Sequence, residues 1–182
     1  LGGGADHLLS LSLALRSEGF ESEIWIGEGP SRDILEKQGL KVCDLELMHS
    51  RWDVGAVWRL GRRIAGSNSP LVHLHGTRAA LYGAAALGLL GKGAPKALYT
   101  AHGLSYRKEG WGPLKGIFVL AEALVGAMMQ GVISVSQSDL DDLIARGFVL
   151  RERAHFIPNA VDAQRFKPAD KKASRRRLGI PE

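Results

Sequence analysis

Two kinds of residue in this chain are suited to binding a small ligand: a run of glycines at the start and three histidines further along. The chain begins LGGGADH, and glycines at 2 to 4 let the backbone approach a ligand closely. Leucines at helical spacing follow from Leu8, so the run predicts a helix start whose free N–H groups could hold an anion, most often phosphate. The dinucleotide fingerprint GxGxxG does not fit, because His7 stands at its third glycine. The run is therefore either a phosphate-facing loop or a purely structural turn.

The three histidines are His73, His75 and His102. His73 and His75 alternate with Leu74, so we expect both side chains on the same face of a strand. No nearby carboxylate has zinc-like spacing, and no metal is expected. We interpret His73 as a packed residue with its nitrogens satisfied. His75 and His102 are each followed by glycine at the end of an apolar strand, where ligands approach, and are predicted to bind one.

Other polar groups are explained without catalysis. Ser136 stands where it would cap a helix, and three aspartates follow it in a first turn that the helix dipole favours. They are Asp139, Asp141 and Asp142. The arginines at 175–177 are interpreted as a solvated face. These segments therefore give no nucleophile and no pair of hydrolytic carboxylates.

Size and composition indicate one domain, or one domain with a tail. The chain has 182 residues, of which 45% are hydrophobic and 24% charged, with a formal net charge of +5. This modest positive charge suits anionic ligands or a lipid surface, and basic residues do not interleave with aromatic ones as a nucleic-acid groove needs. Cys43 is the single cysteine, which fits a reducing compartment. Leu1 is not expected to be a native start, and the most apolar stretches are too short to span a membrane.

Strand-like and helix-like segments alternate through most of the chain. This pattern predicts an α/β fold with a Rossmann-like parallel sheet and helices on both faces. The predicted strands lie at 21–27, 40–47, 70–76, 95–103, 131–136 and 153–158. A first helix is predicted from Leu8 onward, and further helices at 31–39, 53–66, 77–91, 113–129 and 138–147. Ser31 and Asp53 are the expected caps of the second and third helices.

Ligands in such sheets gather beyond the carboxyl ends of the strands. The segments GGGADH, HLHG and TAHG are therefore expected to share one crevice, although the strand that should precede the glycine run is missing from the sequence. We expect a domain over 1–168, and a basic linker with a short helix over 169–182. Between 106 and 120, Arg107, Lys108 and Lys115 surround Trp111, which suggests either an interfacial membrane patch or a lid loop beside a core helix.

Several of these segments together resemble the N-terminal domain of family 4 glycosyltransferases. The resemblance covers residues 2–182 and is most specific in VISVSQSDLDDLIARG and in FIPNAVDAQRFKP, where Ala160 replaces the usual glycine. It implies the GT-B fold, in which two Rossmann-like domains face a cleft. It also implies a retaining transfer of a sugar from a nucleotide-diphosphate donor, without a catalytic metal or other cofactor. The expected acceptor is a glycan or lipid-linked precursor of a cell-envelope polysaccharide.

The resemblance also assigns roles to individual residues. Gly2, Gly3 and Gly4 are expected to approach the donor phosphates and the transferred sugar, with Asp6 beside them. His102 is the expected catalytic residue, close to the reacting sugar. The expected acceptor-side residues are His75 and Arg78, and the least specific assignment is Asn159, at the crossover between domains.

This sequence departs from the family pattern in one large respect. It lacks the C-terminal domain, which holds most of the nucleotide site in this family. The isolated chain is therefore expected to be inactive. Variable loops near 48–55 and 104–113 are expected to select the acceptor.

Two alternative functions remain, a nucleotide-sugar epimerase of GT-B fold and a non-catalytic α/β binding module. An EX7E-type motif beyond residue 182 would favour sugar transfer over both. A nucleotide-dependent reductase is disfavoured, because no acidic residue follows a proper fingerprint. The expected location is the cytoplasm or the inner face of its membrane.

Overall fold

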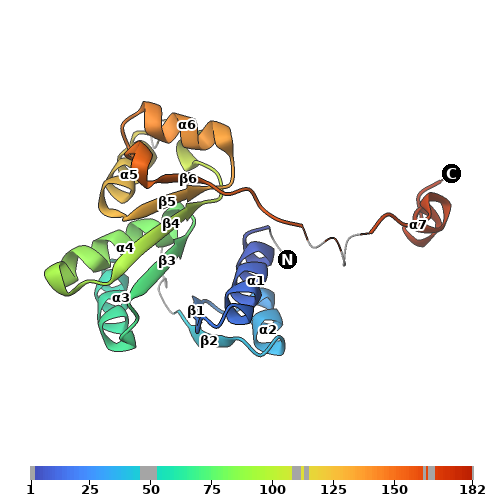
Figure 1. The fold of residues 1–182 in the computed structure, drawn as a ribbon, viewed down its shortest axis with the longest axis horizontal. Coiled ribbons are helices and arrows are strands. Elements are labelled where there is room, and N and C mark those ends of the chain that lie inside the picture. Colours follow the sequence, from blue (N-terminus) through green and yellow to red (C-terminus); the bar gives the residue numbers. More distant parts are fainter. Residues whose placement is uncertain are drawn as a thin grey trace.

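The computed structural model describes residues 3–45, 53–107, 112, 115–161, 163 and 167–181. Gly2, Lys108 and Trp111, all named above, lie outside these residues, as do most of the two loops expected to select the acceptor. The elements alternate between strand and helix as the sequence predicts (Figure 1). They form two units, each with its own parallel sheet.

The larger unit is built on a four-stranded parallel sheet of order β3-β4-β5-β6. Its strands are β3 (Leu71–His75), β4 (Lys96–Ala101), β5 (Gly131–Ser134) and β6 (Ala154–Phe156). The helices that go with it are α3 (Val54–Ser67), α4 (Thr77–Leu90), α5 (Lys115–Met128) and α6 (Gln137–Ala145). Each strand has a helix before the next, and such crossovers keep neighbouring strands parallel. A continuous core of buried apolar side chains runs from α3 to α6 through this sheet.

The smaller unit pairs two short parallel strands, β1 (Glu23–Ile26) and β2 (Lys41–Asp44). It also contains α1 (Gly3–Ser17) and α2 (Pro30–Lys37), which lie beside these strands in Figure 1. Its core has three buried residues, which are Ile24, Leu35 and Leu40. Leu8, Leu9 and Leu13 of α1 pack against them and form the apolar face of this helix.

The predicted α/β fold with parallel strands and flanking helices is confirmed, and the described strands are divided between two sheets that do not pair with each other. Side chains connect the two units instead. Arg63 of α3 donates a hydrogen bond to the carbonyl oxygen of Asp44, and its guanidinium lies 5.1 Å from the ring centre of Trp25. The Trp25 ring in turn packs against the core of the larger unit. The smaller unit is thus held beside β3 and α3 through side chains.

Most helix starts follow the sequence signals, with one exception. Asp53 caps α3 by accepting a hydrogen bond from the Ala56 N–H, and Ser136 caps α6 in the same way. The prediction that Ser31 caps the second helix is wrong. That helix begins at Pro30, whose fixed φ suits the first helical position, and Gly29 is its N-cap.

Beyond β6 the described chain continues as an exposed segment to α7 (Lys171–Arg177) (Figure 1). Asp170 caps this helix by accepting a hydrogen bond from the Ala173 N–H. A short helix in the basic tail is therefore confirmed. None of the helices in the described residues is long and apolar enough to cross a membrane.

Candidate functional site

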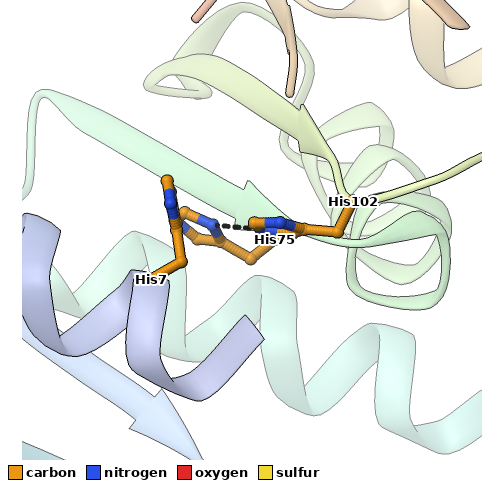
Figure 2. Close-up of side chains that lie close together, drawn as sticks. All are labelled: His7, His75 and His102. Carbon is orange, nitrogen blue, oxygen red and sulfur yellow. Dashed lines mark hydrogen bonds between the residues drawn. The ribbon is translucent and has the colours of Figure 1, made fainter. Parts of the chain in front are cut away.

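Three histidines from separate parts of the chain meet at the carboxyl ends of β3 and β4 (Figure 2). His75 is the last residue of β3, and His102 directly follows β4. The parallel register pairs His75 with Thr100, so the two strands end at the same edge of the sheet. His7 reaches the same place from the first turns of α1. The predicted meeting of GGGADH, HLHG and TAHG in one place is confirmed.

The three rings are in direct contact. His75 Nδ1 and His102 Nε2 lie 3.3 Å apart, a hydrogen-bond distance, and their rings are stacked with centroids 5.6 Å apart. The ring of His7 meets that of His102 edge to face at 4.8 Å and lies 5.6 Å from that of His75. One nitrogen from each ring lies within 4.8 Å of the others. Each residue is only partly buried, so the group is accessible to a ligand.

His73 supports this group from within the sheet. Its Nε2 lies 2.7 Å from Thr100 Oγ1 on the neighbouring strand, and its ring centroid is 4.2 Å from that of His75. Both histidines of β3 therefore project from the same face, as their alternation with Leu74 predicts. His73 is a packed, hydrogen-bonded residue, and its contact with His75 limits the orientations open to that ring.

Burial keeps the histidines at the strand ends uncharged. Desolvation lowers the pKa of His75 to about 3 and that of His73 to about 4, and neighbouring histidines add to both effects. The pKa of His102 is lowered for the same main reason. At neutral pH these imidazoles each offer one N–H donor and one nitrogen acceptor, which suits hydroxyl groups better than phosphate.

A buried polar network lies behind the strand ends. The Glu122 carboxylate of α5 is 1% exposed and accepts hydrogen bonds from the hydroxyls of Thr77 and Tyr99. Ser105 donates to the Thr77 hydroxyl from the segment after His102. Burial raises the pKa of Glu122, while the two hydroxyl donors oppose that rise. The network connects α5, β4 and the start of α4, and so fixes the turns on which His75 and His102 stand.

The glycine run differs from the loop expected of it. Gly3 and Gly4 are already helical, because α1 begins at Gly3, and they form its first turn rather than a loop ahead of it. Both are exposed, and an added Cβ at either would have no atom within 4 Å. Asp6 lies in the same turn, next to His7. The exposed backbone at this end of α1 therefore remains open to a ligand.

Comparison with known proteins agrees with this architecture. The family model described as Glycosyltransferase Family 4 matches residues 1–165. The chain belongs to glycosyltransferase family 4. No curated protein matches it.

Solved structures show the same fold for this family 4 chain. HepE of Anabaena, in complex with UDP and glucose, superimposes with a TM-score of 0.75 at 18% identity, over 98% of this chain and 47% of HepE. A glycosyltransferase from Rickettsia africae gives a TM-score of 0.69 at 15% identity, over 100% of this chain and 48% of the relative. A sucrose-phosphate synthase structure from Thermosynechococcus elongatus gives a TM-score of 0.55 at 14% identity, over 93% of this chain and 88% of the synthase chain. The chain has the N-terminal GT-B fold and spans about half the length of the first two.

The remaining predicted site residues lie outside the histidine group. Arg78 is exposed in the first turn of α4, three residues after His75. Asn159 lies on the exposed segment that follows β6. Their roles stay predictions.

His7 is the residue that sequence reasoning missed. In the sequence it stands out only as the residue that replaces the third glycine of a dinucleotide fingerprint. The signal that could have found it is its place in GGGADH, the segment expected to share a crevice with His75 and His102. A histidine in that segment comes within ring contact of both.

Proposed function

We propose that this chain is the acceptor-side domain of a retaining glycosyltransferase that transfers a sugar from a nucleotide-diphosphate donor. The observation that carries the proposal is the meeting of His75 and His102 at the strand ends, beside the open first turn of α1. Uncharged imidazoles there would accept and donate hydrogen bonds to sugar hydroxyls. The backbone N–H groups of the α1 first turn would face the donor phosphates.

The donor half of the reaction is assigned to a second domain. The HepE structure holds UDP and glucose and is about twice as long as this chain, which supports a nucleotide-sugar donor and a further domain. A leaving diphosphate carries charge that positive groups must stabilise, and burial lowers the pKa of His75 and of His102, which keeps these two imidazoles uncharged. The 182-residue chain alone is therefore expected to transfer no sugar, and no catalytic metal is assigned to the reaction.

Within this scheme His102 is the catalytic residue. It directly follows β4, is partly exposed, and contacts both His75 and His7. It would hold a hydroxyl of the transferred sugar so that the anomeric carbon faces the acceptor. His75 and Arg78 would serve the acceptor side, Gly2 to Gly4 and Asp6 the donor side, and Asn159 the junction with the second domain.

The acceptor is proposed to be a glycan or lipid-linked precursor of a cell-envelope polysaccharide, used in the cytoplasm at the inner face of the membrane. One face of α5 supports a peripheral membrane contact. Its apolar side chains are 41–60% exposed and recur every three or four residues; they are Ile117, Leu120, Leu124 and Met128. Lys115 begins the helix and the chain has a net charge of +5, so an anionic bilayer is the proposed partner of this face. Arg107 pairs instead with Asp139 at 2.7 Å.

The test is kinetic and uses a longer form of the protein that includes the proposed donor-binding domain. His102→Ala should lower kcat by about 10²–10³-fold, the usual cost of losing one positioned hydrogen-bond donor. His155→Ala, on the exposed strand β6, is the matched control and should leave kcat unchanged. His102→Gln keeps an N–H donor and should recover part of the rate. An unchanged kcat in a folded His102→Ala variant would refute the assignment.

A further inference from the structure

The histidine group has the composition of a transition-metal site. His7, His75 and His102 come from three elements, and one ring nitrogen of each lies within 4.8 Å of the other two (Figure 2). The sequence-based expectation of no metal considered His73 with His75 and His102. The structure instead groups His7 with the latter two, and His73 stays hydrogen-bonded to Thr100.

Two of these nitrogens already lie as far apart as two ligands of a single metal ion. Zinc binds imidazole at about 2.0–2.1 Å in a tetrahedral arrangement, which places neighbouring ligand atoms about 3.4 Å apart. His75 Nδ1 and His102 Nε2 lie 3.3 Å apart. The widest separation in the group is 4.8 Å, so small side-chain rotations, of His7 above all, would complete a three-nitrogen face.

The chemistry of the donors selects the metal. The group offers only imidazole nitrogens, which suit Zn²⁺, Cu²⁺ and Ni²⁺ and do not suit Mg²⁺ or Ca²⁺. All three residues are only partly buried, which leaves room for a fourth ligand from solvent.

We propose that His7, His75 and His102 form a binding site for a divalent transition metal, for which Zn²⁺ is the probe. The bound ion would occupy the imidazole nitrogens that the proposed function assigns to sugar hydroxyls. A bound Zn²⁺ ion would therefore inhibit sugar transfer by blocking these nitrogens, and would not act as a cofactor of the reaction. The metal affinity of the chain itself does not depend on the proposed function.

Calorimetry with ZnCl₂ and visible spectroscopy with CoCl₂ test the proposal on the 182-residue chain. We expect one equivalent of Zn²⁺ to bind, and Co²⁺ to give the intense visible bands of a tetrahedral site. His7→Ala, His75→Ala and His102→Ala should each weaken Zn²⁺ binding at least about tenfold. His155→Ala, which removes an exposed histidine on β6, should leave the affinity unchanged.

Replacing His7 by another metal ligand distinguishes a loss of metal coordination from a loss of folding. His7→Cys should keep Zn²⁺ bound and add a thiolate-to-metal band to the Co²⁺ spectrum, whereas His7→Ala should not, although both change the same exposed end of α1. The proposal is overturned if no Zn²⁺ binds, or if binding is the same in His7→Ala and His102→Ala as in the unchanged chain. It is also overturned if His7→Cys gives no thiolate band. A failure of the kinetic test on His102 would leave these results unaffected.

Discussion

The two units of the molecule position their histidines by different means. In the larger unit, His75 and His102 stand at the ends of two strands whose register is fixed by backbone hydrogen bonds and by a large buried core. In the smaller unit, His7 stands on a helix that rests on three buried residues and a two-stranded sheet. The larger unit therefore fixes its two histidines, while His7 depends on a small core.

Because the two units have separate cores, damage to one core should affect a different set of site residues from damage to the other. Damage to the core between α5 and α6 should unfold the larger unit and remove His75 and His102 together. Damage to the smaller core should displace α1, and with it His7 and the glycine turn, while β3 to β6 stay folded. The histidine group thus has one side fixed by a large core and one side that depends on a small core.

The largest effect is expected where α5 meets the segment after α6. A Cβ added at Gly126 would overlap the backbone carbonyl of Phe148, and backbone cannot move aside as a side chain can. We expect Gly126→Ala to lower the free energy of unfolding by about 3 kcal/mol or more, measured by urea denaturation. Gly88→Ala in α4 is the control, because its Cβ would lie 3.6 Å from Met128 Cε, an ordinary contact. It should stabilise the helix by about 0.5–1 kcal/mol, and equal effects at both sites would contradict the account.

The next effect tests the smaller unit. Leu35 is 1% exposed in the three-residue core, so Leu35→Ala should cost about 2–3 kcal/mol. Amide hydrogen exchange should accelerate in α1, β1 and β2 and stay slow in β4 and β5. Uniform acceleration across both sheets would show that the two units unfold together and would remove the distinction between them.

The buried histidines of β3 should make the stability pH-dependent. The pKa of His73 is lowered to about 4 and that of His75 to about 3, so below pH 6.5 the unfolded chain binds protons that the folded chain does not. Stability is therefore fully present above pH 6.5 and is lost as the pH falls towards 4. We expect a loss of about 2 kcal/mol or more between pH 7 and pH 5. His73→Gln should reduce this loss, and His155→Gln should not. If the free energy of unfolding of His73→Gln depends on pH as steeply as that of the unchanged chain, His73 is not a neutral, buried residue.

The smallest effect on stability is expected on the exposed face of α5. Leu120→Asp and Leu124→Asp should change the free energy of unfolding by only about 1 kcal/mol, because at least half of each side chain lies in solvent. Each should nevertheless reduce co-sedimentation of the chain with anionic lipid vesicles. Leu150→Asp, at an exposed leucine before β6, is the matched control. Equal sedimentation of all three variants would exclude α5 as the membrane-facing surface.

The sequence predicted the elements well because apolar periodicity and capping residues are local signals. Asp53 and Ser136 act as caps as expected, whereas Ser31 does not, because Pro30 starts that helix one residue earlier. The pairing of strands is not a local signal, and the division into two sheets could not be predicted from periodicity.

The site was predicted in part for a similar reason. His75 and His102 follow from the rule that ligands bind beyond the carboxyl ends of parallel strands. The contact of His7 with both depends on how α1 packs beside β3, which no spacing along the chain records. Glu122 is a single charge within an apolar stretch of the sequence, which does not by itself indicate a partner. Its hydrogen bonds to Thr77 and Tyr99 show that it belongs to the polar network behind the site.

The central claim is that this chain provides the acceptor side of a glycosyltransferase whose nucleotide site lies mostly in a second domain. The most direct test is calorimetric titration of the 182-residue chain, and of a longer form with that domain, with UDP, GDP and their sugar conjugates. The account predicts that the longer form binds one nucleotide at least about 100-fold more tightly than the chain, a difference of about 2.7 kcal/mol. If the chain alone binds a nucleotide as tightly as the longer form, it is a self-sufficient nucleotide module and the account is wrong.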